Sequence, residues 1–465
     1  MALGARIEGE NGKMGIPQLT AEKYNKILAD YEKKTPKSKK LYKEANRYIS
    51  PSGAPAYMIW HRPYPFFVKK AEGSRVFDVD DNEYVDLFMD QGISIIGHNP
   101  PRVRESIART MDKYGVHLEL CEELATEWAK KVNKHFPSCK RIKIVNSGNE
   151  ATALAVQIAR AYTGRDKVIK FQGHHHGWNA VLSYDGLVAG SGTLFTKGIP
   201  ENHWENLIAL PINDVDKLKG AIKENKDEIA AVIMEPMGAT TGGPPFQEGF
   251  QKEVRELTEE NDILLIFDEV VTAFRVALGG AQEVLGITPD ITVFGKAVGG
   301  GIPIGAVGGS EDIMGVLCVL DSKADCFGLD RIFPMGSFCA QPLAMAAGIA
   351  TIEELEQGDY IRNSILRAEE LTEGINEVAK ALKADFSAYN IYSIVHFGLA
   401  EKIKSDLSNA LDWLEFNQMV RLILLLNDPG VVTLPGHVYM SGVHTKEDID
   451  TAILAFENCL KVYKE

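Results

Sequence analysis

Two short apolar runs in the second half of the chain each stop at a charged residue, and this pattern constrains the fold more than any other feature. Ile263–Phe267 is followed by Asp268, and Ile291–Phe294 is followed by Gly295-Lys296. Short continuous apolar runs are typical of parallel strands that are buried on both faces. The carboxyl ends of such strands meet at one edge of an open α/β sheet, where ligands bind.

The strand and helix pattern recurs along the chain from residue 141. Besides the two runs above, we expect strands at Ile142–Val145, Val168–Phe171 and Ala231–Met234, and helices over 150–162, 214–225, 246–260 and after Pro342. This alternation predicts an α/β fold with a mainly parallel sheet and helices on both of its faces.

The flanking segments predict further parts of the molecule. Residues 1–66 form an N-terminal arm and a crossing segment, because 51–66 is too rich in Pro and aromatic residues for a regular helix. Residues 67–87 alternate apolar and polar side chains as in an antiparallel meander, so we assign 67–100 to a smaller domain. Residues 101–340 make the large domain, and 341–465, with mixed helices and short strands, complete the small α+β domain.

Composition narrows the class of protein and its partners. A chain of 465 residues is long enough for two domains, and a net charge of -14 argues against nucleic acid as a partner. Six cysteines, at positions 121, 139, 318, 326, 339 and 459, show no CxxC spacing. With no signal sequence and no run of eighteen apolar residues, we expect a cytoplasmic protein that has no disulfide framework and does not bind membranes.

An aspartate and a lysine at one sheet edge suit pyridoxal 5′-phosphate. This cofactor needs a lysine for its Schiff base and an acid beside its pyridine nitrogen. Taken singly, a lysine such as Lys296 after a strand is usually a solvated surface residue, and an aspartate such as Asp268 is usually a helix cap or turn residue. The combination favours the cofactor, and Gly299-Gly300-Gly301 would let a ring approach the backbone beside the lysine.

A second candidate site lies between a predicted strand and the helix over 150–162. Ser147, Gly148 and Asn149 would present backbone N–H groups and short polar side chains at a helix N-terminus, which favours a phosphate group. Ordinary N-capping explains the same residues without any ligand. Ser337, on a glycine-flanked loop, has two interpretations of the same kind: a further phosphate contact or a helix-entry turn.

Two motifs follow other predicted strands. The run Gly173–Trp178 contains three consecutive histidines, whose side chains diverge, so it favours one imidazole stacked on a flat ring over a metal site. We predict no metal ion. Glu235 follows Ala231–Met234 directly, and we expect it to brace the site or to contact the substrate.

Several long motifs, in the same order, resemble the class III, fold-type I pyridoxal-phosphate aminotransferases, and most closely the branch of glutamate-1-semialdehyde 2,1-aminomutase. They include VNSGNEATALAVQIARAYTGRDKVIKF, GHHHGW, LLIFDEVVTAFRV, GGAQEVLGITPDITVFGKAVGGGIPIGAVGG and PLAMAAGIATIEEL. The resemblance extends from about Pro65 onward. It implies a large domain with a seven-stranded, mainly parallel sheet, and a homodimer in which each subunit helps to complete the site of the other.

The resemblance also implies a role for each motif residue. Lys296 takes the Schiff-base position and Asp268 the pyridinium partner position. Val270 packs on one ring face, and His175 falls where the family has a tyrosine over the ring. Ser147, Gly148 and Asn149 match the phosphate-binding S-G-T, and the loop that carries Ser337 reaches the phosphate of the neighbouring subunit.

Other positions depart from the aminomutase pattern. The family's S-P-V-R segment, whose arginine holds the substrate carboxylate, has no arginine at the matching place here, and the nearest is Arg62. The S-W-G segment of the substrate site appears as Asp90-Gln91-Gly92. Asp90 either binds a cationic group of the substrate or caps a turn before Gly92. Arg62, Asp90 and Gln91, together with Glu235 at the end of its predicted strand, are the candidate substrate contacts.

We therefore expect an aminotransferase that moves an amino group between an amine or amino acid and a keto acid. The alternative on the same fold is an aminomutase or an amino-acid racemase or epimerase, since all of these reactions use the same cofactor residues. A catalytically silent binding protein on this fold is a third possibility, which the intact Lys296 disfavours.

Overall fold

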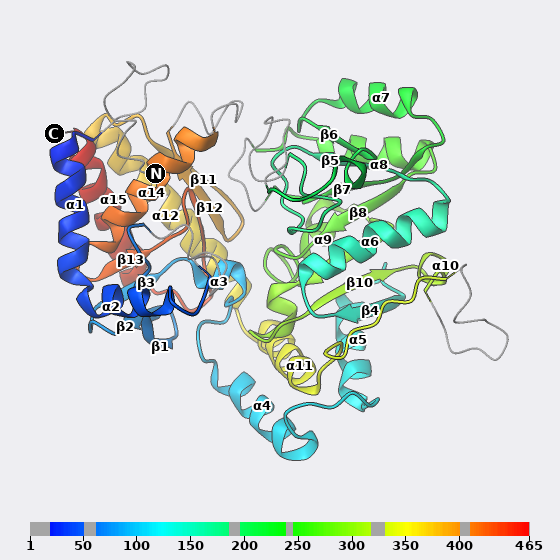
Figure 1. Cartoon of the computed structure of the whole chain (residues 1–465), viewed down its shortest axis with the longest axis horizontal. Coiled ribbons are helices and arrows are strands. Elements are labelled where there is room, and N and C mark those ends of the chain that lie inside the picture. Colours follow the sequence, from blue (N-terminus) through cyan, green and yellow to red (C-terminus); the bar gives the residue numbers. More distant parts are fainter. Residues whose placement is uncertain are drawn as a thin grey trace.

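The computed structural model describes residues 19–50, 62–185, 196–238, 245–317, 331–399 and 410–464. Figure 1 shows two halves side by side, and α4 and α11 lie at the base of the larger one. In the described part of the chain, no helix combines the length and the apolar character needed to cross a membrane.

The larger half is built on the predicted α/β sheet. Its seven strands lie in the order β4-β10-β9-β8-β7-β5-β6, and β10 alone runs antiparallel to its neighbours. The strands are β4 (Arg141–Val145), β5 (Lys167–Phe171), β6 (Leu207–Leu210), β7 (Ile229–Met234), β8 (Leu264–Asp268), β9 (Ile291–Gly295) and β10 (Gly305–Gly309). The five strands named from the sequence are therefore confirmed, and the sheet adds β6 and β10.

The helices of the larger half cover both faces of this sheet. They are α4 (Pro101–Tyr114), α5 (Glu123–His135), α6 (Gly148–Thr163), α7 (Val215–Glu224), α8 (Phe250–Glu260), α9 (Gly280–Leu285), α10 (Glu311–Met314), α11 (Pro342–Gln357) and the 3-10 helices η3 (Glu201–His203) and η4 (Lys296–Gly299). Side chains of α6 share one core cluster with alternate residues of β8, such as Ile266. The intervening residues of β8, such as Phe267, pack with α7 and α8 on the opposite face.

The smaller half combines segments from both ends of the chain. Its elements are α1 (Ala21–Lys34), α2 (Pro36–Ala45), β1 (Val68–Glu72), β2 (Arg75–Asp78), β3 (Glu83–Asp86), α3 (Met89–Gly92), α12 (Tyr360–Leu382), β11 (Ser387–Ile391), β12 (Ile394–Gly398), α14 (Ala410–Leu425), β13 (Gly430–Val432), β14 (His437–Tyr439) and α15 (Lys446–Lys464). The antiparallel meander β1-β2-β3 is confirmed, and β13 joins it in parallel to β3. A separate sheet has the order β11-β12-β14.

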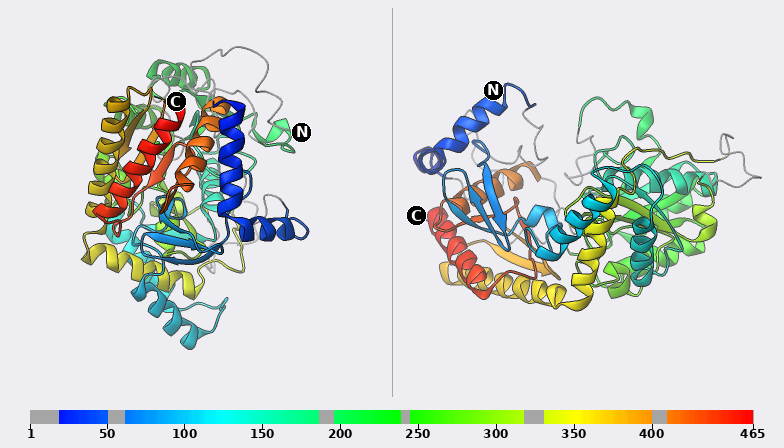
Figure 2. Two further views of the ribbon diagram at one scale, coloured as in Figure 1. Left: turned by 90° about the vertical axis from the view of Figure 1, so that its left-hand side faces the viewer. Right: turned by 90° about the horizontal axis from the view of Figure 1, so that it is seen from below.

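The N-terminal arm packs against the smaller half. Ile27 and Tyr31 of α1 lie in the same core cluster as α12 and α15, and Lys34 Nζ donates to the carbonyl oxygen of Leu425 at 2.9 Å. Both views in Figure 2 agree with Figure 1 that α1 covers the side of this half away from the large sheet. α11 instead packs on α4, α5 and η4 of the larger half.

Candidate active site

A cavity of about 470 Å³ opens where β7, β8 and β9 end and α6 begins. It brings together most of the residues that the sequence analysis proposed. Its lining includes Gln91, Ser147, Gly148, Asn149, His175, Glu235, Asp268, Val270 and Lys296. The parallel strands deliver these side chains to one edge, as the apolar runs with charged ends predict.

Lys296 is the first residue of η4 and directly follows β9. Its backbone φ of +52° is the left-handed conformation, which is uncommon for residues other than glycine. Burial lowers the pKa of its amine from 10.5 to about 8, and the carboxylates of Glu235 and Asp268 oppose that shift. An amine with this pKa exists partly unprotonated near neutral pH, as a nucleophilic lysine must.

Asp268 ends β8 and is held from two sides. Its Oδ2 lies 2.7 Å from Nδ1 of His176, and its Oδ1 accepts the backbone N–H of Val270 at 3.1 Å. Burial raises the pKa of the Asp268 carboxyl from 3.8 to about 7, against the Val270 N–H and Lys296. Burial also keeps the pKa of His176 well below 6.5, so its imidazole is neutral and can donate from Nδ1 to the ionised carboxylate.

The histidine loop, residues 173–178, and the segment after it accept hydrogen bonds from a buried lysine. Lys170 Nζ donates to the carbonyl oxygens of His174, Leu182 and Tyr184 at 3.1, 3.2 and 3.2 Å. Burial lowers the pKa of Lys170 to about 8. The backbone N–H of His175 donates to Glu235 Oε1 at 2.7 Å, which is the bracing role expected of Glu235.

The N-terminus of α6 faces the same cavity. Ser147 is its N-cap, and the Ser147 Oγ accepts the N–H of Glu150 at 3.2 Å. The first N–H groups of a helix have no carbonyl partner within it, so those of Gly148 and Asn149 remain available to an anion. The Asn149 side chain turns to the histidine loop instead, where Oδ1 accepts the N–H of Trp178 at 2.8 Å. Capping and anion binding are thus compatible here.

Glycines let the backbone close around Val270. A Cβ at Gly148 would lie 3.0 Å, and one at Gly295 3.2 Å, from methyl groups of Val270. Of the three glycines after Lys296, Gly301 lines the cavity. A Cβ at Gly299 would lie 2.5 Å from Ile304 Cγ2, and one at Gly300 2.4 Å from the carbonyl oxygen of Ala347 in α11. These two glycines therefore serve packing, which corrects the expectation that all three make room for a ring.

The candidate substrate residues lie in different places. Gln91 lines the cavity, and its φ of +60° continues the left-handed turn that begins at Met89. The Asp90 carboxylate accepts the Ser94 hydroxyl at 2.6 Å and lies 3.4 Å from His98 Nδ1. Asp90 is therefore engaged within its own turn, away from the cavity lining.

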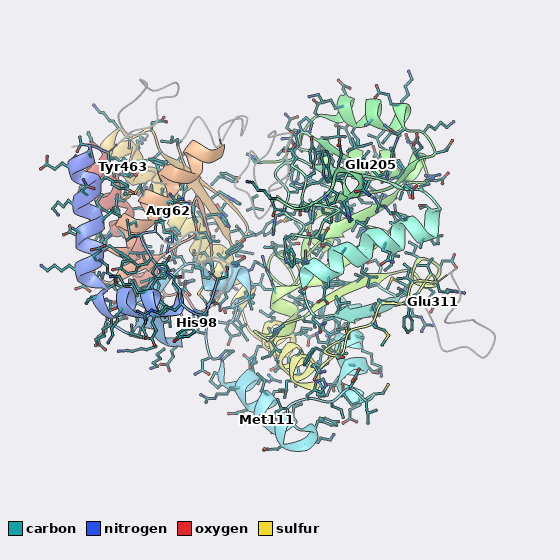
Figure 3. All side chains as sticks on the ribbon, viewed as in Figure 1. Arg62, His98, Met111, Glu205, Glu311 and Tyr463 are labelled. Carbon is teal, nitrogen blue, oxygen red and sulfur yellow. The ribbon has the colours of Figure 1, made fainter. Side chains whose placement is uncertain are left out.

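Arg62 and Ser337 also lie outside this lining. Figure 3 places Arg62 in the smaller half, and its side chain is exposed. Ser337 is exposed on the loop before α11, and its carbonyl oxygen accepts Gln341 Nε2 at 3.3 Å. Within one chain, the structure does not bring either residue to the described wall of the cavity.

Three buried residues near the site escaped the sequence analysis, Lys170, Arg275 and Tyr439, and His176 appeared there only as one of three consecutive histidines. Arg275 Nη2 donates to the carbonyl oxygen of Gly92 at 2.6 Å and its Nη1 to that of Met440 at 2.8 Å. The Tyr439 ring centre lies 5.8 Å from Lys296 Nζ and 5.5 Å from the Arg275 guanidinium carbon. Only Lys170 carried a signal, as a charged residue inside a strand of otherwise apolar character.

These groups fit pyridoxal phosphate. The site offers an amine at Lys296, a buried carboxylate at Asp268 and, at the start of α6, helix N–H groups and a hydroxyl for a phosphate. Gly148, which has no side chain, lets Val270 approach the start of that helix closely. Among the described residues, no group of three or more His, Cys, Asp or Glu side chains is arranged to hold a metal ion.

Comparison with known proteins agrees with this geometry. The family model "Aminotransferase class-III" matches residues 56–459. Two relatives named glutamate-1-semialdehyde 2,1-aminomutase are 37% identical (Methanocaldococcus jannaschii) and 38% identical (Brevibacillus brevis), each alignment covering 91% of this chain and 98% of the relative.

Solved structures show the same fold. An omega-transaminase from Sphaerobacter thermophilus has a TM-score of 0.82 at 29% identity, covering 92% of this chain and 98% of that one. A glutamate-1-semialdehyde-aminomutase from Pseudomonas aeruginosa has a TM-score of 0.83 at 25% identity, covering 96% and 99%. This chain belongs to the class III aminotransferase family, whose members have fold type I and use pyridoxal 5′-phosphate.

Proposed function

We propose that this chain is a pyridoxal-phosphate-dependent aminomutase, which moves an amino group between two carbons of one substrate. The observation that carries the cofactor chemistry is the meeting of Lys296, Asp268 and the start of α6 around one cavity. The relatives at 34–38% identity, named glutamate-1-semialdehyde 2,1-aminomutase, support the intramolecular reaction over transfer between two molecules.

The chain's own residues have separate tasks in this proposal. Lys296 would bind the cofactor covalently, and its pKa of about 8 suits an amine that takes and returns a proton at the substrate carbon. Asp268, oriented by His176, would stand beside the ring nitrogen. Ser147 and the N–H groups of Gly148 and Asn149 would hold the phosphate. When bound, the cofactor draws electrons from the substrate carbon that loses the proton.

The second candidate is transfer between an amine or amino acid and a keto acid. Gln91 favours it, because this residue lines the cavity at the position where the aminomutases have an aromatic residue. Arg62 lies outside the cavity lining. The arginine that holds the substrate carboxylate in the aminomutases therefore has no counterpart within the described wall of the cavity. A racemase or epimerase would use the same cofactor residues but return the proton to the opposite face of the same substrate carbon, and it is a further alternative.

One experiment separates these reactions. The cofactor-loaded protein is incubated with glutamate 1-semialdehyde alone, and 5-amino-4-oxopentanoate is measured, with Lys296→Ala as the control. Product without any second substrate supports the aminomutase. Amino transfer only when a donor and a keto acid are both present would overturn it in favour of the aminotransferase. Deuterium uptake from solvent with loss of chirality, and no change in connectivity, would identify a racemase or epimerase.

We also propose a homodimer, in which the loop that carries Ser337 reaches the partner's site. Exposed apolar side chains surround this loop, at Phe333, Met335 and Phe338, and continue at Val116 and Leu120. The two segments touch, because the rings of His117 and Phe338 are 5.1 Å apart. An exposed apolar area of this kind marks an interaction surface. We propose a cytoplasmic location, because scattered cysteines without paired spacing are typical of proteins in a reducing compartment.

A mixed dimer tests the shared site. Lys296→Ala and Ser337→Ala subunits, each impaired alone, are co-expressed with different tags and purified as the mixed species. One of its two sites would have Lys296 from its own subunit and Ser337 from the other, so activity should return to about half of the wild-type value. A mixed dimer no more active than the better of the two parents would refute a shared site, and a monomer in sedimentation would refute the dimer.

A further inference from the structure

Four consecutive residues beside the cavity have a left-handed backbone conformation. The φ angles of Met89, Asp90 and Gln91 are +43°, +52° and +60°, and that of Gly92 is +87°. Residues other than glycine adopt this conformation singly and rarely in succession, because their Cβ atom comes too close to the following carbonyl oxygen. A turn that repeats it at three such residues persists only where the surrounding structure holds it.

The last residue of this turn packs tightly against the larger half. A Cβ at Gly92 would lie 3.0 Å from Tyr439 Cδ1 and 3.2 Å from Arg275 Nε. The carbonyl oxygen of Gly92 accepts Arg275 Nη2 at 2.6 Å. Since Arg275 follows β8, the carboxyl end of the turn is held by the half that carries Lys296.

A buried carboxylate, Asp86, holds the amino end of the turn. Its Oδ1 accepts the backbone N–H groups of Phe88 and Met89 at 2.8 and 3.1 Å. Its Oδ2 lies 2.7 Å from Nε2 of His98. Asp86 is 2% exposed, so its charge is stable only with partners of this kind. One carboxylate therefore connects the start of the turn to His98.

His98 connects this carboxylate to a second one within the turn. His98 Nδ1 lies 3.4 Å from Asp90 Oδ2, and the same oxygen accepts the Ser94 hydroxyl at 2.6 Å. An ionised carboxylate only accepts hydrogen bonds, so a histidine that faces one carboxylate from each ring nitrogen must donate from both nitrogens. Only the protonated ring has two donors, so the arrangement requires an imidazolium between Asp86 and Asp90.

The surroundings of His98 favour this charge. Burial opposes it, but the hydrogen bond to Asp86 and the charges of Asp86 and Asp90 together raise the pKa of His98 above 6.5. The other ionisable side chains packed nearby are His444, whose Nε2 lies 2.9 Å from the carbonyl oxygen of Asp86, and the ion pair of Arg75 with Asp448.

The turn presents one of its side chains to the cavity. Of its four residues, all of them described, Gln91 alone belongs to the cavity lining. Successive side chains of such a turn point in different directions, so a change of φ at any of the four would redirect Gln91. The position of the Gln91 carboxamide therefore depends on the groups that hold the turn.

We propose that His98 is a positioning residue for substrate recognition: by bridging Asp86 and Asp90 it holds the left-handed turn, and so keeps the carboxamide of Gln91 at the cavity for a hydrogen bond to the substrate. This inference rests on the proposed function, because it concerns binding at the same site. The proton on His98 Nδ1 leaves first, since the contact with Asp90 is the longer one. A lone pair then faces the Asp90 carboxylate, and the bridge opens.

Four variants separate this role from simple packing. His98→Gln removes the cation, Gln91→Ala removes the side chain that it positions, and a double variant combines the two changes. Asp90→Asn replaces the second carboxylate by an amide, which can donate to a neutral His98 and tolerates the left-handed backbone. His135→Gln is the matched control, because His135 Nε2 also lies 2.7 Å from a carboxylate oxygen, that of Glu356 in α11.

Kinetics with glutamate 1-semialdehyde measure the effect on binding. His98→Gln and Gln91→Ala should each raise KM about tenfold and leave kcat unchanged. The double variant should raise KM no further, because the two residues act as a unit. The KM of the wild-type protein should rise as the pH increases through the pKa of His98, whereas Asp90→Asn should keep a low KM across that range. Additive effects of the two substitutions, a pH dependence that Asp90→Asn retains, or an equal loss in His135→Gln would overturn the proposal.

Hydrogen–deuterium exchange of the cofactor-free protein reports on the turn without any substrate. The peptide over 87–97 contains the N–H groups that Asp86 accepts and that of Ser94, which donates to the carbonyl oxygen of Met89 at 3.2 Å. At pH 6, below the pKa of His98, its exchange should be about tenfold faster in His98→Gln than in the wild type and unchanged in His135→Gln.

The two measurements have separate consequences. Equal exchange in His98→Gln and the wild-type protein would overturn the role of His98 in holding the turn. Absence of any turnover of glutamate 1-semialdehyde by the wild-type protein would instead refute the proposed function, and the exchange measurement would still decide whether His98 holds the turn that carries Gln91.

Discussion

Replacing Asp268 by Asn should stabilise the cofactor-free protein, and the gain should grow with pH. Burial raises the pKa of this carboxyl from 3.8 to about 7. The native state therefore holds a proton on Asp268 that the unfolded chain releases between these two pH values. Its contribution to stability is complete below pH 3.8 and is lost as the pH rises through 7. Asn has no charge to bury, so its stability lacks this dependence.

The size of the effect follows from the shift of about three pKa units. Each unit corresponds to about 1.4 kcal/mol, so ionising Asp268 in its buried site costs about 4 kcal/mol above pH 7. Asn can still accept the Val270 N–H, but an amide facing His176 can leave a buried hydrogen bond unmade, at about 1–2 kcal/mol. The net gain at pH 8 should be about 2–3 kcal/mol, and the change between pH 5 and pH 8 about 2.5 kcal/mol.

Urea unfolding of cofactor-free wild-type and Asp268→Asn protein, at unit steps from pH 5 to pH 8, measures this difference directly. Asp290→Asn, at a carboxylate paired with Arg255 at 2.8 Å, is a control that should lose stability. A difference between Asp268→Asn and wild type that stays constant across this range would refute the reasoning, because the gain would then not arise from ionisation. The variant should also bind pyridoxal phosphate less well.

Three further substitutions have expected outcomes. Lys296→Ala should abolish turnover and the covalent form of the cofactor, seen in the visible spectrum; full turnover would exclude this lysine from the chemistry. Lys170→Met should leave the carbonyl oxygens of His174, Leu182 and Tyr184 unpaired, lowering the free energy of unfolding at pH 7 by about 2 kcal/mol and weakening cofactor binding. No change in either urea unfolding or cofactor titration would contradict that role. Asp90→Lys should cost about 1 kcal/mol through the lost Ser94 bond and reduce kcat/KM equally for cationic and neutral substrates. A loss confined to cationic substrates would show that Asp90 faces the substrate after all.

The sequence predicted the parts of the site that depend on local pattern. Lys296 and Asp268 each follow an apolar run, and neighbouring parallel strands end at the same edge of a sheet. The proximity of these two residues could therefore be predicted from the sequence alone. The start of α6 was recognisable for the same reason, since Ser147 sits between a strand and a helix.

Contacts between distant segments were not predictable in this way. His176 and Asp268 are 92 positions apart in the chain, and only the folded loop decides which histidine of the three meets the carboxylate. β10 was missed because its residues, Gly305–Gly309, include three glycines and no apolar run. A Cβ at Gly305 would lie 2.0 Å from the carbonyl oxygen of Ser147, so close approach to the start of α6 excludes the side chains that mark a strand.

The direction of the Asp90 side chain could not be predicted from the sequence either. Its φ of +52° within a left-handed turn directs the carboxylate to Ser94 rather than to the cavity. The residues Asp90-Gln91-Gly92 suggest a turn, but no rule of composition states which of two adjacent side chains such a turn presents to a ligand.

The buried guanidinium of Arg275 has a consequence for how the two halves respond to a ligand. It ties the carbonyl oxygens of Gly92 and Met440 to the segment that follows β8. A rotation of one half against the other would separate charged hydrogen bonds in a place that water does not reach. The hydrogen bonds of Arg275 thus resist movement of one half relative to the other. We therefore expect the spacing of the cavity walls to change little when a substrate enters, so that the side chains lining them decide which substrates are accepted.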